Sequence, residues 1–493
     1  MRTPRTTRTR SKGTAILSAR LRPKVKLEAQ PSREIVAHFP GHSVSLGEFS
    51  AGVADCAQKL GIGLPFSSFV ADDQSVDDEI HLLVRRLATH GLVEYRLEAS
   101  PSGEELVVIE PQVSDYWPHM PSLRDKDALV LSRFAYLRRR GNELVLESPR
   151  ADALFKICDP KFATTLAILS TPQQVKHLRQ RDGLPGFELL ALLLDCQMLL
   201  RTKTASDRGL RPIEGDDNLV LWDFHDLLFH ARSTEGRHAN PLGGLYLYAQ
   251  TISPPPAVRA PWPGKKIALG KFSPTQSEAL SPVTRVLRQR RSMRNFDDQL
   301  PITRDELSRF LDGTALIQSE KTTQFEFGEY PPLVTYTVRP YPSAGGCYEF
   351  ELYIAVDNCE GLARGFYHYD ARRHALVPIA VRETELEALL MRAAFAMGAP
   401  AAPQVLITIA ARFSRVSWKY SSIAYALILK DVGVLLQTFY MMATDMGLGG
   451  CAIGITNIDL FARMTGIEFH VEGPVGQFAI GRGTTAEVGP RST

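Results

Sequence analysis

The alternation of apolar and polar positions divides the chain into stretches with different periods. Over residues 77–89, apolar residues recur three and four positions apart, which predicts an amphipathic helix. Two short apolar runs follow, at 93–97 and 106–109, on either side of the turn-forming segment Ala99-Ser-Pro-Ser-Gly103. Helices followed by a two-stranded ribbon predict a winged-helix-like module over residues 28–115.

A similar pattern follows over residues 116–215. Strand-like runs at 128–137 and 144–147 precede helical patterns near 172–179 and 186–200. The two stretches share no exact repeat, but the order of their elements is alike. We therefore predict a second small winged-helix-like module in tandem with the first.

The remaining residues, 216–493, predict a larger domain of mixed helices and strands. A proline-rich connector at 253–263 is stiff and extended by composition. A strand is expected at 349–356, where every second residue is apolar, and a long helix at 423–446. The fold class predicted for the chain is α+β.

The positive charge of the chain is concentrated at its N-terminus. Nine of the 57 Lys and Arg residues lie within residues 1–26, and no acidic residue precedes Glu28. The remainder has 48 basic residues against 54 acidic ones. We therefore expect a basic flexible tail at residues 1–27 in front of an acidic body.

Other features exclude several classes of protein. The tail lacks the apolar stretch of a secretory signal, and the most apolar segment, 186–200, is interrupted by acidic residues, so a cytoplasmic protein without membrane contact is expected. Six scattered cysteines without a CxxC pair argue against a metal site. Arg85 and Arg86 are an isolated basic pair beside acidic residues, which favours protein docking over nucleic-acid binding.

Three segments have compositions that suit a ligand. The first, Arg290-Arg-Ser-Met-Arg-Asn-Phe296, places guanidinium groups beside a hydroxyl, a set that holds phosphate groups. The second, Arg339-Pro-Tyr-Pro-Ser-Ala-Gly-Gly-Cys-Tyr348, contains a turn whose bare backbone allows close approach of a flat ring. Taken alone, the arginine cluster is more often a solvated face, and the second segment is equally compatible with a simple structural turn.

The third segment is Gly447-Leu-Gly-Gly-Cys-Ala-Ile-Gly454. Its GxGxxA spacing resembles a dinucleotide-binding fingerprint, which requires a strand before it and a helix after it. Here the predicted helix comes first, so a Rossmann site is rejected.

Taken together, in this order and spacing, the segments resemble the nitroreductase-like flavoproteins. The similarity is to the SagB-type dehydrogenases, which oxidise thiazolines and oxazolines in ribosomally made peptides. It extends over about residues 221–482, and its marks are RRSMRNF, RPYPSAGG, GFYHYD, GLGGCAIG and FAIGR.

The resemblance implies FMN as cofactor and a homodimer as the assembly. The FMN phosphate and ribityl chain would be held by Arg290, Arg291, Ser292 and Arg294. Arg482 is a weaker candidate for the same role. The flavin ring would be lined from the opposite subunit by the turn residues Pro342, Ser343, Ala344 and Gly345. Gly454 would offer its backbone N–H near the flavin N5.

The adjacent pair Lys419 and Tyr420 resembles the Lys-Tyr dyad of azoline oxidases and is assigned a catalytic role. A lysine ammonium close to a phenol favours the phenolate, which suits a general base. The alternative is an ordinary surface lysine beside a core tyrosine. The chain departs from its relatives in the long helix, where Asp431-Val-Gly433 and Gln437-Thr438 stand in place of a His or Asn.

The leading hypothesis is FMN-dependent oxidation of azolines to azoles in a modified precursor peptide, with oxygen reoxidising the flavin. The partners would be the peptide, both its leader and its azoline core, and a cyclodehydratase or heterocyclase complex. Two alternatives remain: an NAD(P)H-dependent nitro or quinone reductase, and a scaffold that binds precursor peptide. The sequence identifies neither the peptide nor the preferred ring type.

Overall fold

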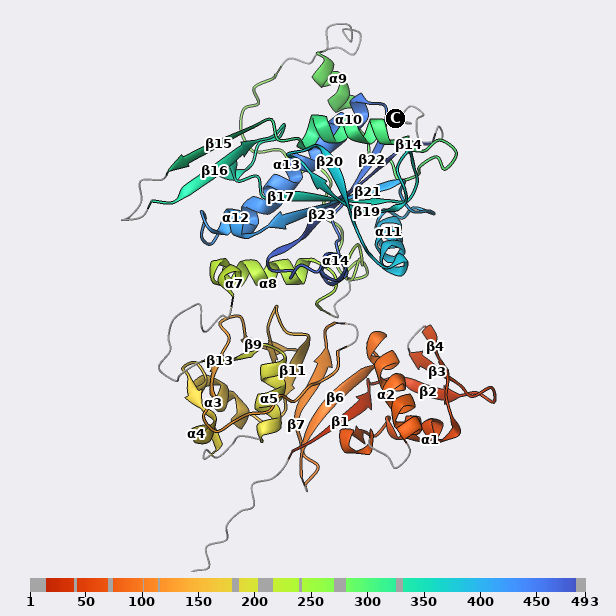
Figure 1. Cartoon of the computed structure of the whole chain (residues 1–493), viewed down its shortest axis with the longest axis vertical. Helices are drawn as coiled ribbons and strands as arrows, with labels where there is room; N and C mark the ends of the chain where they lie inside the picture. The colour runs from red at the N-terminus through yellow and green to blue at the C-terminus, as the bar shows by residue number, and fades with distance from the viewer. Residues whose placement is uncertain are drawn as a thin grey trace, which may run out of the picture. The chain divides into compact units, whose positions relative to one another are not determined.

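A computed structural model of the chain describes residues 15–39, 42–69, 74–100, 102–113, 116–179, 186–202, 216–238, 242–269, 281–324 and 331–484. These residues form two compact units (Figure 1). The N-terminal unit extends to Arg232 and includes residues 236–240, and the C-terminal unit contains residues 233–235 and the chain from Pro241 onward.

The N-terminal unit is built on an antiparallel seven-stranded sheet. The strands, in spatial order, are β5 (Leu64–Pro65), β1 (Ala15–Leu21), β6 (Val93–Ala99), β7 (Glu105–Pro111), β11 (Ala153–Ile157), β10 (Glu143–Glu147) and β9 (Tyr136–Arg140). Two three-stranded sheets accompany it, β2 (Lys26–Ala29), β3 (Glu34–Phe39) and β4 (His42–Glu48), and β12 (Gln173–Gln174), β8 (Ala128–Leu131) and β13 (Leu199–Thr202).

Most helices of this unit, from the first to the fifth given below, contribute apolar residues to one hydrophobic core with the strands. They are α1 (Ala51–Lys59), α2 (Gln74–Thr89), α3 (Lys161–Ile168), α4 (Val175–Arg179), α5 (Phe187–Asp195), α7 (Asp217–Leu221) and α8 (Phe224–Ser233), with a 3-10 turn, η1, at Phe66–Phe69. The predicted amphipathic helix and ribbon are confirmed as α2, β6 and β7.

The predicted division of this region at residues 115 and 116 is wrong. Strand β7, from the first expected module, pairs with β11 from the second, with Ala153 opposite Pro111 and Ile157 opposite Val107. A single sheet therefore crosses the expected boundary. Pairing with β11 satisfies the backbone groups along the edge of β7, and such long-range pairing leaves no mark in the local periodicity.

The predicted flexible tail at residues 1–27 is also corrected. Residues 15–21 form β1, which pairs with β6 along its whole length and buries Leu17, Ala19 and Leu21. Arg20 forms an ion pair with Glu94 on the neighbouring strand. The charge of Arg20 suggested a solvated tail because its acidic partner lies 74 positions away in the sequence. Residues 1–14 lie outside the described residues.

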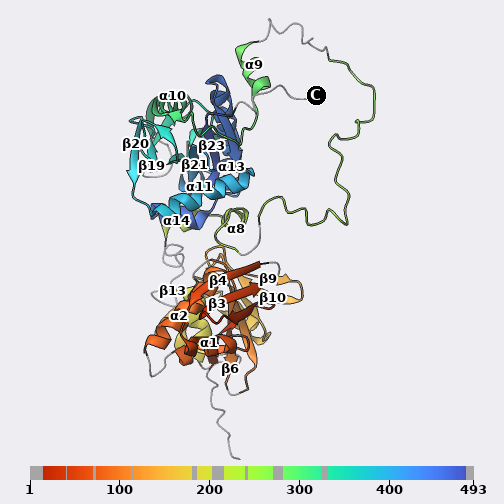
Figure 2. The ribbon, with the colours of Figure 1, turned by 90° about the vertical axis from the view of Figure 1, so that its right-hand side faces the viewer.

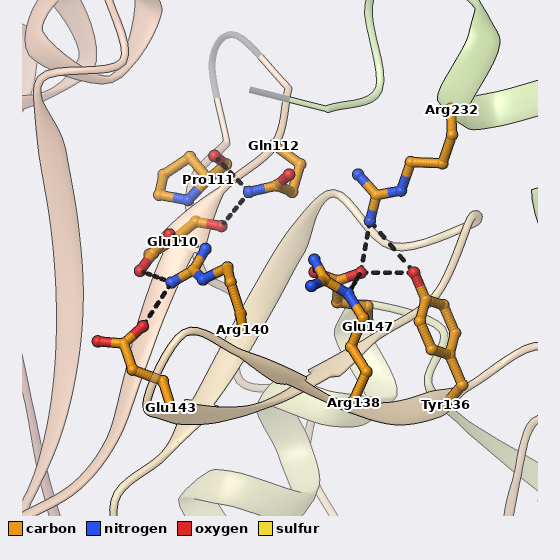
Figure 3. A network of polar contacts seen from close by, with 9 residues as sticks. All are labelled: Glu110, Pro111, Gln112, Tyr136, Arg138, Arg140, Glu143, Glu147 and Arg232. Carbon is orange, nitrogen blue, oxygen red and sulfur yellow. Dashed lines mark hydrogen bonds and ion pairs between the residues drawn. The ribbon is translucent and has the colours of Figure 1, made fainter. Parts of the chain in front are cut away.

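The predicted start of the C-terminal domain at residue 216 lies too early, because α7 and α8 belong to the N-terminal unit. Arg232 on α8 donates a hydrogen bond of 2.7 Å to the carboxylate of Glu147, which is 2% exposed (Figure 3). Tyr136 and Arg138 donate to the same carboxylate. A buried carboxylate requires such donors. The ion pair between Arg232 and Glu147 therefore holds α8 against the sheet.

The C-terminal unit contains an antiparallel six-stranded sheet. Its strands, in spatial order, are β20 (Ala375–Ile379), β19 (Gly365–Asp370), β17 (Phe350–Val356), β21 (Val405–Arg412), β23 (Glu472–Gly481) and β22 (Gly449–Ile453). Outside it lie the hairpin of β15 (Ser319–Gln324) and β16 (Leu333–Val338), and the short parallel pair β14 (Ile302–Thr303) and β18 (Cys359–Glu360).

Helices accompany this sheet, and the last four of them lie in the connections between its strands. They are α9 (Pro282–Gln289), α10 (Arg304–Ala315), α11 (Glu383–Met397), α12 (Ser414–Ser417), α13 (Ala424–Asp445) and α14 (Ile458–Thr465), with a 3-10 turn, η3, at Ala344–Gly346. Helices α11 and α14 lie side by side and share a core with the sheet (Figure 2). The predicted strand and long helix are confirmed as β17 and α13, and the α+β class with them.

Helix α13 is the one described helix that is long and apolar enough, by composition, to cross a membrane. It packs against α10, β22 and β23, and it buries Ile428, Leu435 and Phe439. Its apolar character is therefore used in packing within the unit.

Candidate functional site

The arginine-rich segment follows helix α9. Ser281 caps the N-terminus of this helix, where its hydroxyl accepts a hydrogen bond from the backbone N–H of Thr284. After Arg290 the chain becomes extended and runs beside β22, where the Met293 N–H donates to the carbonyl of Gly450 at 2.9 Å. The Met293 side chain is buried, whereas Arg294 is exposed. Met293 thus anchors the segment to β22 through its backbone and its buried side chain, while the side chain of Arg294 remains exposed.

Tyr440 on α13 connects this segment to β22. Its hydroxyl lies 2.7 Å from the Ser292 hydroxyl and accepts a hydrogen bond of 2.8 Å from the Ala452 N–H. The Arg290 guanidinium lies over its ring, 5.0 Å from the ring centre. Sequence reasoning missed Tyr440, because a tyrosine in a long apolar helix has the signature of a core residue.

Gly454 follows directly on β22 and is exposed. No protein atom lies within 4 Å of the position that a Cβ would take there. The backbone at this point is therefore accessible to a ligand.

The proline–glycine turn and the Lys-Tyr pair meet in space. The Lys419 ammonium donates a hydrogen bond of 2.9 Å to the carbonyl of Gly345. A Cβ on Gly345 would lie 2.6 Å from the Lys419 Nζ and in collision with the Tyr420 hydroxyl. Gly345 also has a φ of +55°, a conformation that favours glycine. The structure thus brings together two groups of residues that the sequence assigned to one site.

Two buried carboxyl groups support this turn. The Ser343 hydroxyl lies 3.1 Å from Glu349 Oε2 and 3.2 Å from Asp431 Oδ2, and the Ala344 N–H donates to Asp431 Oδ2 at 2.7 Å. Burial raises the pKa of Glu349 to about 7, and the negative charge of Asp431 adds to the effect. The sequence marked Asp431 only as a departure from relatives, and it did not single out Glu349.

Arg482, the weaker candidate for the phosphate, forms an ion pair within its own unit. Its guanidinium donates to both carboxylate oxygens of Glu306 at 2.8 Å, and Glu306 also caps α10 through Thr303. Burial by itself would raise the pKa of Glu306, but the hydrogen bonds from Thr303 and Arg482 outweigh it and lower that pKa. A phosphate at Arg482 would have to compete with this ion pair.

The glycine turn and the arginine-rich segment contact opposite sides of α13. Asp431, which holds the turn, and Tyr440, which holds the arginine segment, are nine residues apart. At 3.6 residues and 5.4 Å per turn, they are half a turn out of phase and about 13 Å apart along the helix. The turn of one chain therefore does not face its own arginine segment across this helix.

Cavities occur elsewhere in this unit. One of about 380 Å³ lies between α10 and the β19–β20 hairpin, beside Ser308 and His374. Another of about 100 Å³ lies beside Thr456 and Asn457. Neither is lined by a residue predicted to bind FMN, and among the described residues no three His, Cys, Asp or Glu side chains are grouped to hold a metal.

Models of known families match two stretches of the chain. One described as the nitroreductase family matches residues 287–482, and one described as the cyanobactin oxidase ThcOx matches residues 129–239. A Methanocaldococcus jannaschii protein named as a nitroreductase is 33% identical over 169 residues, covering 34% of this chain and 76% of the relative. The chain belongs to the nitroreductase family. The two models also confirm the resemblance to SagB-type azoline oxidases of the nitroreductase superfamily.

Solved structures similar to this nitroreductase-family chain include a peptide-modifying synthetase complex and two proteins named as nitroreductases. A chain from the E. coli microcin synthetase McbBCD complex with truncated pro-MccB17 is 17% identical, with 57% of this chain and 100% of that chain covered and a TM-score of 0.39. A nitroreductase-named protein of Anabaena variabilis is 24% identical, with 36% and 34% covered and a TM-score of 0.30. One from Desulfovibrio desulfuricans in complex with FMN is 15% identical, with 44% and 92% covered and a TM-score of 0.27.

The residues of this nitroreductase-family unit fit an FMN molecule. Arg290 and Arg291 are half-buried beside the Ser292 hydroxyl, and this combination of cations and a hydroxyl suits a phosphate. The open backbone at Gly454 and the glycine turn at Gly345 both permit close approach of a flat ring. These five positions are the strongest candidates for cofactor contacts.

Proposed function

We propose that this protein is an FMN-dependent oxidase of thiazoline and oxazoline rings in a modified precursor peptide. The observation that carries the proposal is the convergence of Lys419 and Tyr420 on Gly345, in the turn assigned to the flavin ring. The cyanobactin oxidase match at 129–239 supports the same substrate class, because a simple reductase has no need of this region.

Oxidation of an azoline removes a hydride and a proton from the ring. Bound FMN would be the oxidant, because it would accept the hydride. Tyr420 is the residue proposed to take the proton as a general base. The Lys419 ammonium, anchored on Gly345 and 5.5 Å from the centre of the Tyr420 ring, would stabilise the negative charge of a phenolate.

We assign the binding of the precursor peptide's leader to the N-terminal unit, and we expect a cyclodehydratase or heterocyclase as the partner enzyme. The contacts of two arginines argue against nucleic-acid binding. The Arg85 guanidinium lies over the Trp117 ring, and Arg86 lies over Phe49 and donates to the carbonyl of Leu46. Both cations are thereby used within the unit. A cytoplasmic location fits this pathway.

A homodimer is part of the proposal. Because the arginine segment and the glycine turn lie on opposite sides of α13, one FMN would be held by Arg290 and Ser292 of one subunit and by the Gly345 turn of its partner. A pocket shared in this way encloses both faces of the flavin ring.

The decisive experiment measures FMN uptake and turnover of a synthetic peptide that contains one thiazoline. Wild-type protein should bind FMN and form the thiazole, and Lys419→Ala and Tyr420→Phe should lose on the order of 10²–10⁴-fold in rate while they keep FMN. Lys430→Ala, at an exposed lysine of α13, is the matched control. Colourless protein that takes up no FMN on reconstitution would contradict the proposal.

A second candidate, an NAD(P)H-dependent nitro or quinone reductase, is favoured by the name of the M. jannaschii relative. The same variants separate it from the first. Rapid flavin reduction by NADPH and steady turnover of a nitroarene, unchanged in Lys419→Ala, would establish the reductase. Peptide binding without any flavin chemistry would establish a scaffold.

A further inference from the structure

Glu349 and Asp431 place two carboxyl groups in one buried position. Glu349 is 0% exposed, and Asp431 on α13 is 7% exposed. Both carboxyl groups contact the same hydroxyl: Ser343 Oγ lies 3.1 Å from Glu349 Oε2 and 3.2 Å from Asp431 Oδ2. The two groups therefore compete for the single hydrogen of that hydroxyl.

Counting hydrogen atoms indicates that one of the two carboxyl groups carries a proton. The Ser343 hydroxyl accepts a hydrogen bond from the Tyr348 N–H at 2.9 Å and has a single hydrogen to donate. If both carboxyl groups were ionised, that hydrogen would serve one of them, and the other would face the hydroxyl oxygen without a proton between them. One added proton completes the set of hydrogen bonds.

The remaining oxygen of Glu349 identifies which group is neutral. Glu349 Oε1 is buried and has no hydrogen-bond partner, whereas Asp431 Oδ2 accepts from the Ala344 N–H. An unpartnered carbonyl oxygen of a neutral acid costs far less than an unpartnered carboxylate oxygen. The proton therefore resides mainly on Glu349.

The cations around the pair are directed elsewhere. On the strand side, Arg339 donates to the carbonyl of Phe350, and on the α12 side Arg415 donates to the carbonyl of Cys347 and Lys419 to that of Gly345. The other titratable or charged groups nearby are Tyr341, Cys347, Tyr348 and Arg412. Within the described part of the chain, no Arg or Lys forms an ion pair with either carboxyl group.

We propose that Glu349 and Asp431 share one proton, and that this proton holds the turn from Ser343 to Gly345 in the shape that receives the FMN ring. The inference rests on the proposed function in naming FMN as the ligand. Glu349 and Asp431 are positioning residues, because they act through the turn. Since Lys419 is anchored on the same turn, its position depends on the pair as well.

The consequence is a dependence of FMN binding on pH. Burial raises the pKa of Glu349 to about 7. The stabilising contribution of the shared proton is fully present below the ordinary pKa of 4.5 and is lost as the pH rises through about 7. Above that pH a second buried negative charge appears beside Asp431. FMN affinity should then fall, by up to about tenfold per pH unit.

Glu349→Gln tests the proposal, because glutamine has the shape of the neutral acid and keeps a donor toward Ser343 and Asp431. FMN affinity of the full-length protein is measured by quenching of flavin fluorescence at about pH 6 and about pH 8.5, on either side of the titration. Wild type should weaken at the higher pH, and Glu349→Gln should bind equally at both. Glu351→Gln, at a carboxylate paired with His368, is the matched control and should behave as wild type.

Infrared spectroscopy of the flavin-free protein gives a readout that does not depend on FMN. A carboxylic-acid C=O band should disappear between the same two pH values in wild type and be absent from Glu349→Gln. A missing band, or an identical pH dependence in both proteins, overturns the shared proton. The band without FMN binding at any pH supports the shared proton and overturns the proposed function.

Discussion

The Lys419 ammonium donates a hydrogen bond of 2.9 Å to the carbonyl oxygen of Gly345, 74 positions earlier in the chain. This contact joins the residue assigned to catalysis with the turn assigned to the flavin ring. The geometry of the Lys-Tyr pair therefore depends on the backbone of a segment that is remote in the sequence.

Gly345→Ala should disrupt this geometry. The new Cβ would collide with the Tyr420 hydroxyl and the Lys419 ammonium, and the φ of +55° would be strained by roughly 1–2 kcal/mol. We expect azoline oxidation to fall about a hundredfold, since small displacements of reacting groups have effects of that size. Gly466→Ala is the control, because Gly466 has a φ of +71° with nothing within 4 Å. Equal activity in the two variants would contradict the expectation.

Tyr440→Phe should loosen the arginine segment. The substitution leaves the Ser292 hydroxyl and the Ala452 N–H without their common partner, at a cost of about 1–3 kcal/mol in the free energy of unfolding. FMN affinity should fall with it. A double-mutant cycle with Ser292→Ala, followed by chemical denaturation, measures the coupling. Full additivity of the two substitutions would show that the hydroxyl contact contributes nothing.

Arg482→Gln should affect stability more than cofactor binding. The lowered pKa of Glu306 means that its stabilising contribution is present above the ordinary pKa of 4.5 and is lost as the pH falls below it. Both side chains are partly exposed, so the loss at pH 7 should be no more than about 1 kcal/mol. The difference between the variant and wild type should shrink in acid. A large loss of FMN affinity would instead place Arg482 at the phosphate.

Mixing two inactive variants tests the shared pocket. If each FMN is held by the arginine segment of one subunit and the turn of the other, a heterodimer of Arg290→Ala and Lys419→Ala subunits has one intact site. Random exchange of subunits should then restore about a quarter of the wild-type activity. Lys419→Ala mixed with Tyr420→Phe, which damage the same group of residues, should restore none. Absence of recovery in the first mixture, with subunit exchange verified, would assign the pocket to one chain.

Much of the local structure was predictable from the sequence. The helix α2, the β6–β7 ribbon, the strand β17 and the long helix α13 follow from the period of their apolar residues, which is a local property. The capping box of α10 is also a local feature, since Thr303 and Glu306 are three positions apart. The candidate FMN residues and Lys419-Tyr420 came from motifs, each a short continuous stretch.

The tertiary structure alone decided which of these stretches meet. β1 joins a sheet and β7 pairs with β11 because backbone groups far apart in the chain satisfy one another, and periodicity within either strand does not identify its partner. In the same way, Glu349 and Asp431 meet only at the Ser343 hydroxyl in the folded unit. The proton proposed to be shared between them could not be foreseen from either residue in the sequence. Tyr440 lies about two and a half turns from Asp431, on the opposite side of α13, and this separation matters only because the turn and the arginine segment pack on those two sides.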